Sequence, residues 1–453
     1  MKQSDKSLKY PASTIILAGG FGTRMKSKTP KVMHKICGKE MLFCILDEVL
    51  KISDDIHIIL FNEADFIKDA IYKNYADSSA IITTHLQDYD NFPGTAGAIM
   101  KGSKAGDSNN IKSPISTKYE KILILSGDMP LVCAERLSEF IERENDIVMG
   151  ILELDDASNY GRVIMQNDKV VEIIEEKDAS EAQKQINLAN AGIYCIKRTL
   201  LESALPQIDS NNNQGEFYLT DIIKFSDDIS GVLAKECDFM GVNSKIDLAR
   251  AEDFMLWRLR KNAMKNGVIL RNPSSIYIEC DVVFEGECEI ENGAVIKGKS
   301  SIINSKILSH SVVESSVIKN SDIGPFARIR PNSIVESSHI GDFVEIKNSI
   351  LYEVKAGHLS YLGDSEIKSG TNIGAGTITC NFDGVKKHKT FIGENVFVGS
   401  GVQLVAPIEI QDDVLIAAGS TVTKNAKSGD LVISRTKQEN KSGFFYKFFG
   451  GKI

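Results

Sequence analysis

The chain has 453 residues, of which 42% are hydrophobic and 25% charged, and its formal net charge is −8. This length exceeds what one ordinary hydrophobic core organises, so we predict two or three domains. The acidic balance argues against a general nucleic-acid-binding surface, and we expect no nucleic-acid partner. The eight cysteines form no CxxC pair, which argues against a zinc site or a disulfide framework.

Neither a signal peptide nor a membrane span is predicted. The opening stretch MKQSDKSLKYPAS lacks the apolar core of a signal peptide. No apolar run approaches the roughly 18 residues that a membrane-spanning helix requires. We therefore expect a cytoplasmic protein without integral membrane association.

The first half of the chain alternates between expected strands and helices. Residues 13–18, STIILA, predict a short buried strand, and the glycine-rich turn GGFGTRM follows at once. Strands are expected next at 56–61 and 80–84, with a helix near 63–75. A glycine turn after a buried strand is typical of nucleotide-binding α/β units, because it lets the backbone approach a phosphate closely. The turn matches neither the P-loop nor the six-residue dinucleotide fingerprint, so a merely tight turn is the alternative.

Two later residues favour a phosphate site. Lys31 follows a proline shortly after the glycine turn and is suited to hold a phosphate as a point charge; a solvated surface lysine is the alternative. The run KILIL at 121–125 predicts a central strand that ends in SGD, with Asp128 last. An acidic residue there lies where ligands bind in open α/β sheets and can hold Mg²⁺ with substrate phosphates. A helix-capping aspartate is the alternative.

Further along, strands are expected near 170–180 and at 189–194, and a helix is expected to begin within 215–223. A longer helix is predicted over about 245–265, with Ser244 and Asp247 as a partial capping box. This helix separates the two halves of the chain. The expected division is an α/β domain over 1–243, a linker helix over 244–267, a repeat domain over 268–440 and a tail over 441–453.

The second half follows a six-residue period. Apolar residues fall six apart in four runs, which are Ile278 to Leu308, Val317 to Val335, Ile340 to Ile346 and Ile392 to Val422. This period fits neither an α-helix nor an alternating strand, and it predicts a solenoid of hexapeptide coils with one apolar side chain per strand pointing inward.

The period lapses between Ile346 and Ile367 and again between Ile373 and Ile392. Polar interruptions of a solenoid mark a functional loop or a surface insertion. His358 lies in the first lapse, within KAGHLSYLGD, and histidine suits a general base; a surface histidine is the alternative. The tail, NKSGFFYKFFGGKI, follows no pattern, and its aromatic cluster suggests docking on a neighbouring subunit or a membrane surface, with a loosely ordered end as the alternative.

A set of specific motifs occurs in a fixed order along the chain. The first half contains LAGGFGTRMKSKTPKVMHKICGK, SGDMPL, NYGR, EEKDA, NAGIY, NNNQGEFYLTDII and GVN, and the second contains GPFARIRP, GDFVEIKNS, KAGHLSYLGD, NIGAGTITCNFDG, FVGSGVQLVAP, IAAGSTVT and ISR. Together they resemble the GlmU family of bifunctional bacterial enzymes over about residues 13–437. The resemblance implies an N-terminal Rossmann-like nucleotidyltransferase domain, a C-terminal left-handed parallel β-helix and assembly as a homotrimer.

The resemblance also implies two reactions. Glucosamine-1-phosphate is acetylated by acetyl-CoA, and UMP passes from UTP to the N-acetylated product. Pyrophosphate and UDP-N-acetylglucosamine, a precursor of peptidoglycan and lipopolysaccharide, are then released. Uridylyl transfer needs cations and backbone N–H groups that bring two polyanions together. Acetyl transfer needs a base near neutrality, because the attacking amine has a pKa of roughly 8.

Residue by residue, the resemblance assigns the uridylyl site first. Arg24 and Lys31 contact phosphates, Asp128 and Asn243 carry Mg²⁺, and the nucleotide and sugar are bound by Leu17, Ala18, Gly19, Gly20, Gln87, Gly94, Thr95, Ser126, Gly127, Gly161, Glu175 and Asn190. Two features depart from the family, which often has tyrosine at position 126 and a slightly shorter loop between Gln87 and Gly94.

For acetyl transfer, the resemblance assigns His358 as the base, and Glu345 is the candidate to orient its ring. The sugar phosphate would bind to Arg330, Lys347, Tyr361 and Asn372. Acetyl-CoA would bind to Ala375, Asn381, Phe382, Ser400, Ala418 and Arg435. Phe382 stands where the family commonly has tyrosine.

Two other functions remain open at this stage. One is a nucleotidyltransferase whose β-helix only oligomerises or regulates, and the other is a non-catalytic interaction protein. The His358 loop and the segment NIGAGTITCN favour the bifunctional enzyme, because a plain scaffold needs neither.

Overall fold

The computed structural model describes residues 10–101, 114–158, 160–166 and 169–450. Asn159 of the NYGR motif and the outermost residues of the first domain and the tail therefore lie outside the described residues. The chain forms two compact units, Met1–Met255 and Leu256–Ile453. Helix α7 (Lys245–Lys265) occupies the region expected to link the domains, and the boundary between the units falls within it.

The first unit is built on a nine-stranded sheet in the order β11-β7-β10-β6-β1-β4-β5, with β8 and β9 attached to β10. Strands β6, β1, β4 and β5 are parallel, whereas β10 runs antiparallel to both of its neighbours in the main sheet. The strands are β1 (Ala12–Leu17), β4 (Asp55–Leu60), β5 (Ile81–Leu86), β6 (Lys121–Ser126), β7 (Ile147–Glu153), β8 (Arg162–Gln166), β9 (Lys169–Ile174), β10 (Leu188–Lys197) and β11 (Ile229–Ala234); β2 (Lys35–Ile36) and β3 (Lys39–Glu40) form a separate pair.

Helices cover both faces of this sheet. One buried cluster includes apolar residues of the sheet together with those of α1, α2 and α4, and a second includes those of α3, α5 and η5. This three-layer arrangement is the Rossmann-like architecture expected from the sequence. The helices are α1 (Met41–Val49), α2 (Ala64–Tyr75), α3 (Thr95–Ile99), α4 (Ala134–Glu142), α5 (Arg198–Ala204) and α6 (Glu236–Phe239), with 3₁₀ turns η1 (Thr23–Met25), η2 (Lys31–Met33), η3 (Gln183–Gln185), η4 (Leu205–Gln207) and η5 (Leu219–Phe225).

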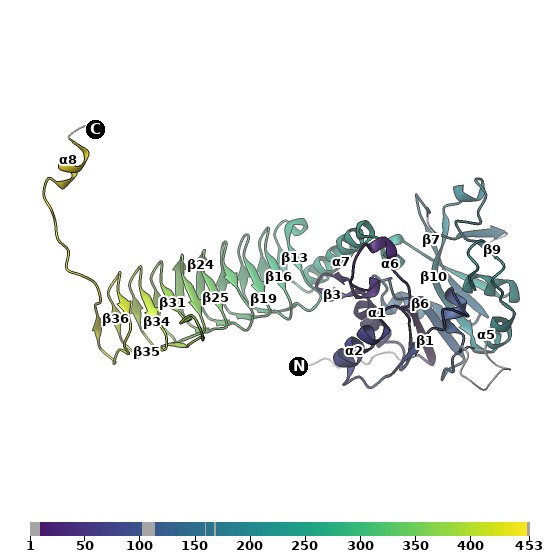
Figure 1. Ribbon diagram of the computed structural model, residues 1–453, viewed down its shortest axis with the longest axis horizontal. Coiled ribbons are helices and arrows are strands. Elements are labelled where there is room, and N and C mark those ends of the chain that lie inside the picture. The colour runs from purple at the N-terminus through teal and green to yellow at the C-terminus, as the bar shows by residue number, and fades with distance from the viewer. Residues whose placement is uncertain (1–9, 102–113, 159, 167–168, 451–453) are drawn as a thin grey trace. The chain divides into compact units, whose positions relative to one another are not determined.

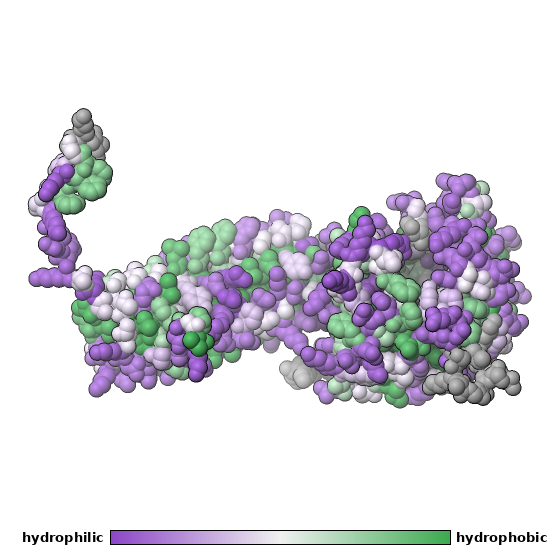
Figure 2. Space-filling view, in the orientation of Figure 1, coloured by the Kyte–Doolittle hydropathy of each residue, from purple (hydrophilic) through white to green (hydrophobic). Residues whose placement is uncertain are grey.

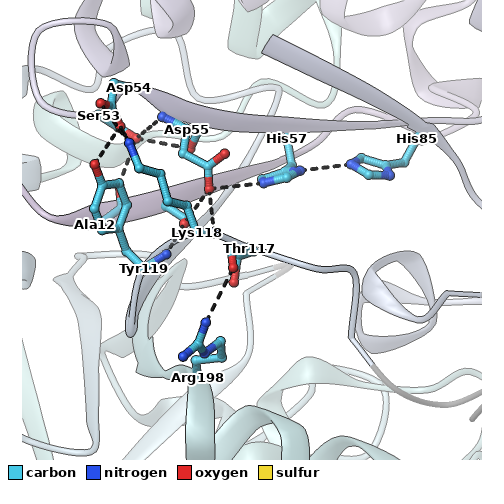
Figure 3. A network of polar contacts seen from close by, with 11 residues as sticks. Ala12, Ser53, Asp54, Asp55, His57, His85, Thr117, Lys118, Tyr119 and Arg198 are labelled. Carbon is cyan, nitrogen blue, oxygen red and sulfur yellow. Dashed lines mark hydrogen bonds and ion pairs between the residues drawn. The ribbon is translucent and has the colours of Figure 1, made fainter. Parts of the chain in front are cut away.

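A buried polar network ties β1, β4 and β5 to the segment before β6 (Figure 3). The carboxylate of Asp55 accepts hydrogen bonds from Ser13 Oγ at 2.6 Å and from the Lys118 backbone N–H at 2.9 Å. His57 Nε2 lies 3.3 Å from the same carboxylate, and His57 Nδ1 lies 2.9 Å from His85 Nε2. Burial would raise the pKa of Asp55, but these donors outweigh it and hold that pKa below its usual value.

The second unit is a parallel β-helix whose coils stack side by side (Figure 1). It is the left-handed hexapeptide-repeat solenoid predicted above. Its first face is β12 (Ile269–Leu270), β15 (Glu289–Ile290), β18 (Lys306–Ile307), β21 (Asp322–Ile323), β24 (His339–Asp342), β27 (Lys355–His358), β30 (Asn372–Ile373), β33 (Phe397–Val398), β36 (Leu415–Ile416) and β38 (Leu431–Val432).

The second face is β13 (Tyr277–Ile278), β16 (Val295–Lys297), β19 (Val312–Glu314), β22 (Arg328–Ile329), β25 (Glu345–Lys347), β28 (Tyr361–Gly363), β31 (Ile378–Cys380), β34 (Gln403–Val405) and β37 (Thr421–Val422). The third is β14 (Val283–Glu285), β17 (Ser301–Ile303), β20 (Val317–Lys319), β23 (Ile334–Glu336), β26 (Ile350–Tyr352), β29 (Ser365–Ile367), β32 (Thr390–Ile392) and β35 (Ile408–Ile410). The 3₁₀ turn η6 (Pro273–Ser275) precedes β13, and helix α8 (Phe444–Phe449) follows the solenoid.

The inward side chains recur at intervals of five as well as six residues, which corrects the predicted phase. Ile307 and Ile318 are fully buried, whereas Leu308 and Val317, predicted to point inward, are only partly buried. The predicted lapse between Ile346 and Ile367 is also wrong, because Leu351, Ala356 and Leu362 fill the bore there. One five-residue step runs from Ile346 to Leu351, and its corner contains Asn348 in the left-handed region at φ 48°.

The second predicted lapse is a real insertion. Between the inward Thr379 and Ile392 the chain makes an excursion at 381–389, closed by a bridge between Phe382 and Lys387. Buried serines at one corner also connect successive coils: the N–H of Ser338 donates to Ser321 Oγ at 3.0 Å, and the N–H of Val354 donates to Ser338 Oγ at 2.9 Å. Such a hydroxyl fits the narrow corner and satisfies a buried N–H group.

Candidate active sites

A cavity of about 460 Å³ opens in the first unit where β1, β5 and β6 end at their carboxyl edge. This is the edge at which open α/β sheets bind ligands. The structure brings together nine of the residues that the resemblance assigned to the nucleotide and sugar, and these line the cavity: Leu17, Gly19, Gly20, Gln87, Gly94, Thr95, Ser126, Glu175 and Asn190.

Three further predicted residues lie behind this lining. Ala18 is buried, and a Cβ on Gly127 would lie within 3.1 Å of Ala18, so these two residues pack closely at the end of β1. Gly161 packs against the Glu175 carboxyl group, and its carbonyl oxygen accepts a hydrogen bond from the backbone N–H of Asn190 at 2.8 Å. These residues shape the wall of the cavity through backbone contacts.

The glycine turn after β1 brings the predicted phosphate-binding cations close to the cavity. Gly22 has φ 62°, and a Cβ there would lie 2.7 Å from the Lys31 side chain, so only glycine fits. Lys31 begins η2 and is largely buried, whereas Arg24 on η1 is exposed. The turn thus leaves one cation fixed by packing and one in solvent.

Lys31, Asp128 and Asn243 converge from three distant parts of the chain. The Lys31 ammonium forms an ion pair with Asp128 and donates to Asn243 Oδ1 at 2.7 Å. The Asp247 carboxylate accepts from the backbone N–H groups of Asn243 and Ser244 at 3.0 and 2.8 Å, which fixes the turn before α7. The predicted capping box is therefore confirmed, and it positions the Asn243 side chain.

Gln87 is positioned as a hydrogen-bond acceptor. Its amide nitrogen donates to the carbonyl oxygens of Phe92 and Gly94, at 3.0 and 3.2 Å. Its Oε1 therefore faces Gly19, where a Cβ would lie 3.2 Å away. A fixed acceptor beside the glycine turn matches the N3–H group of a uracil ring and disfavours cytosine, which has an acceptor there.

Sequence reasoning missed several residues of the cavity wall. Tyr194 lines the cavity with its hydroxyl group buried, and burial raises the pKa of that phenol against the opposing effect of the Asn190 side chain. Burial also raises the pKa of Glu175, against the opposing effect of the Thr220 hydroxyl at 3.3 Å. Tyr194 stands within NAGIY, so the motif marked the segment without indicating which side chain points inward.

Phe21 and Tyr89 line the cavity, and Phe61 packs against both rings. Phe21 contacts Phe61 and Tyr89 edge-on, with ring centroids 5.4 and 5.2 Å apart, and Phe61 stacks on Tyr89 at 4.9 Å. They follow β1, β4 and β5, three neighbouring strands. No single segment of sequence contains this cluster, and only the strand order assembles it.

In the second unit His358 pairs with Asp342. The two residues end β27 and β24 and face each other in register, with His358 Nδ1 at 2.6 Å from Asp342 Oδ1. This contact, with the backbone N–H of Asp342, holds the pKa of the carboxyl group below its usual value. Glu345, the predicted partner of the ring, instead accepts from Arg330 Nη1 at 2.8 Å, so that prediction is wrong. The reason is register: Asp342 lies one coil before His358 on the same face.

The corner between the first and second faces aligns the predicted base with the predicted acetyl-CoA residues. His358, Ala375, Ser400 and Ala418 each follow an inward residue by two positions in four successive coils. The coils are joined there by hydrogen bonds from Gly401 N to Ala375 O and from Gly419 N to Ser400 O, at 2.7 and 2.8 Å. Arg435 folds back to this corner and donates to the Ala418 carbonyl at 2.7 Å.

The second face gathers positive charge next to this corner. Arg330 and Lys347 lie in neighbouring coils, and Lys387 of the 381–389 excursion adds a third basic group. The adjacent Lys387 amine, more than burial, lowers the pKa of Lys347. Like charges held together in this way suit a phosphate group. Lys387 was not predicted, and its signal was its place in the second lapse of the period.

Tyr361 and Asn381 connect this basic group to the excursion. Asn381 Nδ2 donates to Asp364 at 2.5 Å and lies 3.4 Å from the Tyr361 hydroxyl. Gly363 makes room for the ring, because a Cβ there would lie 2.4 Å from the same hydroxyl. Phe382 is 59% exposed. Asn372 starts β30 on the first face, in register with Lys355.

The fold and these two sites define a protein that joins a nucleotidyltransferase unit to a hexapeptide-repeat transferase unit. A family model described as nucleotidyl transferase matches residues 13–228, and one described as bacterial transferase hexapeptide (six repeats) matches residues 389–424. The chain is 53% identical to the bifunctional protein GlmU of Helicobacter hepaticus, covering 97% of this chain and 98% of that protein. It is 52% identical to the protein of the same name from Nitratiruptor sp., covering 97% and 99%.

The chain therefore belongs to the GlmU family of bifunctional enzymes. Within the described residues, no helix is both long enough and apolar enough to cross a membrane. The same residues hold no group of three or more histidine, cysteine or acidic side chains that could bind a metal ion.

Proposed function

We propose that the chain acetylates glucosamine-1-phosphate with acetyl-CoA in the second unit and then transfers UMP from UTP to the N-acetylated sugar phosphate in the first. The products are pyrophosphate and UDP-N-acetylglucosamine. The observation that carries this proposal is that each unit holds its own set of reactive side chains, around Lys31 and Asp128 in one and around His358 and Asp342 in the other. These substrates are cytoplasmic metabolites, so the cytoplasm is the expected location.

In the first unit a phosphate oxygen of the sugar attacks the α-phosphorus of UTP, and the bond from that phosphorus to the pyrophosphate oxygen breaks. No base is needed, because the nucleophile is already an anion at neutral pH. Lys31 stabilises the charge that develops on the phosphates, and the Gln87 carbonyl oxygen orients the uracil ring. Glu175 and Asn190 line the same cavity and offer hydrogen-bond partners for sugar hydroxyl groups.

The residues present fit a Mg²⁺ ion. The carboxylate of Asp128 and the amide oxygen of Asn243 already converge on one cation, the Lys31 ammonium. Mg²⁺ prefers oxygen ligands of this kind, with substrate phosphates and water completing the set. We propose that Asp128 and Asn243 hold the ion, which when bound would neutralise phosphate charge.

In the second unit the His358 base acts on the amine of glucosamine-1-phosphate. The Asp342 carboxylate accepts the Nδ1–H, which leaves Nε2 with its lone pair toward the substrate. As the amine attacks the thioester carbonyl, Nε2 takes its proton, the carbon–sulfur bond breaks and the coenzyme A thiolate leaves. Arg330, Lys347 and Lys387 hold the sugar phosphate, and the corner at Ala375, Ser400 and Ala418 holds the acetyl-CoA.

We also propose that the chain assembles as a homotrimer. One corner of the solenoid exposes an apolar ladder in which the rings of His310, Phe326 and Phe343 stack at 5.2 and 5.5 Å. Leu359, 62% exposed and next to His358, continues the ladder. Exposed apolar surface of this extent in one line favours burial against another copy. Light scattering on the purified chain measures this mass directly.

Separate inactivation of the two sites tests the proposed reactions. His358→Ala should abolish acetyl transfer and leave UTP-dependent pyrophosphate release from N-acetylglucosamine-1-phosphate intact. Asp128→Ala should do the reverse, and each variant is the matched control for the other. Loss of both activities from either single change in a folded protein would contradict two independent sites.

A further inference from the structure

The tail after the solenoid presents an uncovered aromatic helix. Every residue from 433 to 450 is exposed, and the five aromatic side chains of α8 are between 52% and 72% exposed. Their rings contact one another, with centroids 4.9 Å apart for Phe445 and Phe449 and 6.1 Å apart for Phe444 and Phe448. Figure 2 shows the helix as an apolar patch at the end of a hydrophilic segment. Because a six-residue helix is unstable alone in water, this surface needs a partner.

The distribution of side chains around α8 indicates the kind of partner. At about 100° per residue the five aromatic side chains span an arc of roughly 200°, and Lys447 lies opposite its centre. A helix that binds a protein groove needs an apolar stripe only about half as wide. A wide aromatic arc with lysine on the polar side is typical of helices that lie in a membrane interface.

The charge of the tail contrasts with that of the rest of the chain. Residues 436–453 contain four basic side chains, Lys437, Lys441, Lys447 and Lys452, and one acidic side chain, Glu439. The tail is therefore at +3, which leaves −11 on the other residues of a chain whose total is −8. The tail favours an anionic partner, which the remainder of the protein repels.

The segment between the solenoid and α8 lets the tail bind an anionic surface while the acidic remainder of the protein stays away from that surface. Residues 436–443 are exposed and, when extended, span up to about 26 Å. Electrostatic repulsion fades over a Debye length of about 8 Å at physiological salt. The aromatic helix can thus reach an anionic surface while the acidic body of the protein stays beyond the range of repulsion.

We propose that α8 anchors the protein peripherally to an anionic lipid bilayer. The phenylalanine rings lie at the boundary between headgroups and acyl chains, Tyr446 at the edge of the arc lies at headgroup level, and Lys441 and Lys447 face lipid phosphates. This is an association with the membrane surface, in keeping with the absence of a spanning helix among the described residues. Single short anchors of this kind bind reversibly.

Sedimentation of the full-length protein with lipid vesicles tests the anchor. The wild type should sediment with vesicles of phosphatidylcholine mixed with phosphatidylglycerol, and less with phosphatidylcholine alone or at high salt. Phe445→Ser with Phe449→Ser should lower the affinity more than about tenfold, because two buried rings are lost. Lys441→Glu with Lys447→Glu should lower it at least about 25-fold, at about fivefold per lysine. The matched control is Phe66→Ser, an equally exposed ring on α2, which should change nothing.

A variant with its single tryptophan in α8 tests whether this helix lies in the membrane interface. Trp257 is the single tryptophan, so Trp257→Phe with Phe448→Trp reports on the tail alone. Its emission should shift to the blue with phosphatidylglycerol vesicles and stay unchanged with phosphatidylcholine. The proposal is overturned if the wild type fails to bind anionic vesicles or if the phenylalanine variant binds them as well as the wild type. It is also overturned if that variant breaks up the oligomer, since a second copy then covers the helix.

Discussion

Replacing Asp342 tests the proposed acetyl-transfer site most directly, because the residue was found only in the structure. Asp342→Asn keeps the size of the side chain and removes the negative charge that accepts the His358 Nδ1–H at 2.6 Å. The amide can present its NH₂ group to that nitrogen, which favours the wrong tautomer and places the hydrogen on Nε2. The imidazolium that forms during acetyl transfer also loses its counter-charge.

The size of the effect follows from how exposed this pair is. Loss of a partner that orients a reactive histidine costs from about tenfold at metal sites to about 10⁴-fold in a buried catalytic triad. The His358 and Asp342 side chains are 67% and 39% exposed, so water partly replaces the lost contact. We therefore expect the kcat of acetyl transfer to fall by about tenfold, at the low end of that range, with an unchanged KM for glucosamine-1-phosphate.

The assay follows free thiol released from acetyl-CoA, and uridylyl transfer by the same preparation shows that the variant is folded. Glu345→Gln is the matched control, because Glu345 contacts Arg330 and should alter the KM for the sugar phosphate instead of kcat. Wild-type kcat in Asp342→Asn, together with a tenfold loss in Glu345→Gln, would refute the assignment of Asp342 as the partner of the ring.

Three further predictions follow from the structure. Lys31→Ala should remove about 3 kcal/mol of transition-state stabilisation from uridylyl transfer and lower its kcat accordingly, while acetyl transfer in the same protein stays normal; a small loss would mean that Lys31 does not contact the reacting phosphates. Lys387→Ala should raise the KM for glucosamine-1-phosphate about tenfold and raise the pKa of Lys347 toward its usual value, measured by the pH dependence of chemical modification; an unchanged KM would remove Lys387 from the site. Asp55→Asn should destabilise the first unit by about 1–3 kcal/mol in thermal unfolding at neutral pH, unlike the exposed control Asp69→Asn. Because the folded-state pKa of Asp55 is lowered, its contribution is complete above the unfolded value of about 3.9 and is lost as the pH falls through the folded pKa, so the variant should lose this acid dependence.

Much of the architecture was predictable because it depends on short sequence patterns that repeat locally along the chain. An inward apolar residue every six positions specifies a coil regardless of what lies far along the chain, and the solenoid was predicted on that basis. The glycine turn after 13–18 and the acidic end of the strand at 121–126 likewise predicted the edge of the sheet at which the nucleotide cavity lies. The five-residue steps were missed, because a shortened corner changes the phase without changing the composition.

The tertiary structure alone decided which side chains meet. Lys31 reaches Asn243 across 212 positions, and the rings of Phe21, Phe61 and Tyr89 meet because their strands are neighbours. Composition and period identify the elements, since both depend on nearby residues. The partner of His358 depends instead on the register of parallel strands 16 residues apart, and that register places Asp342 beside the ring.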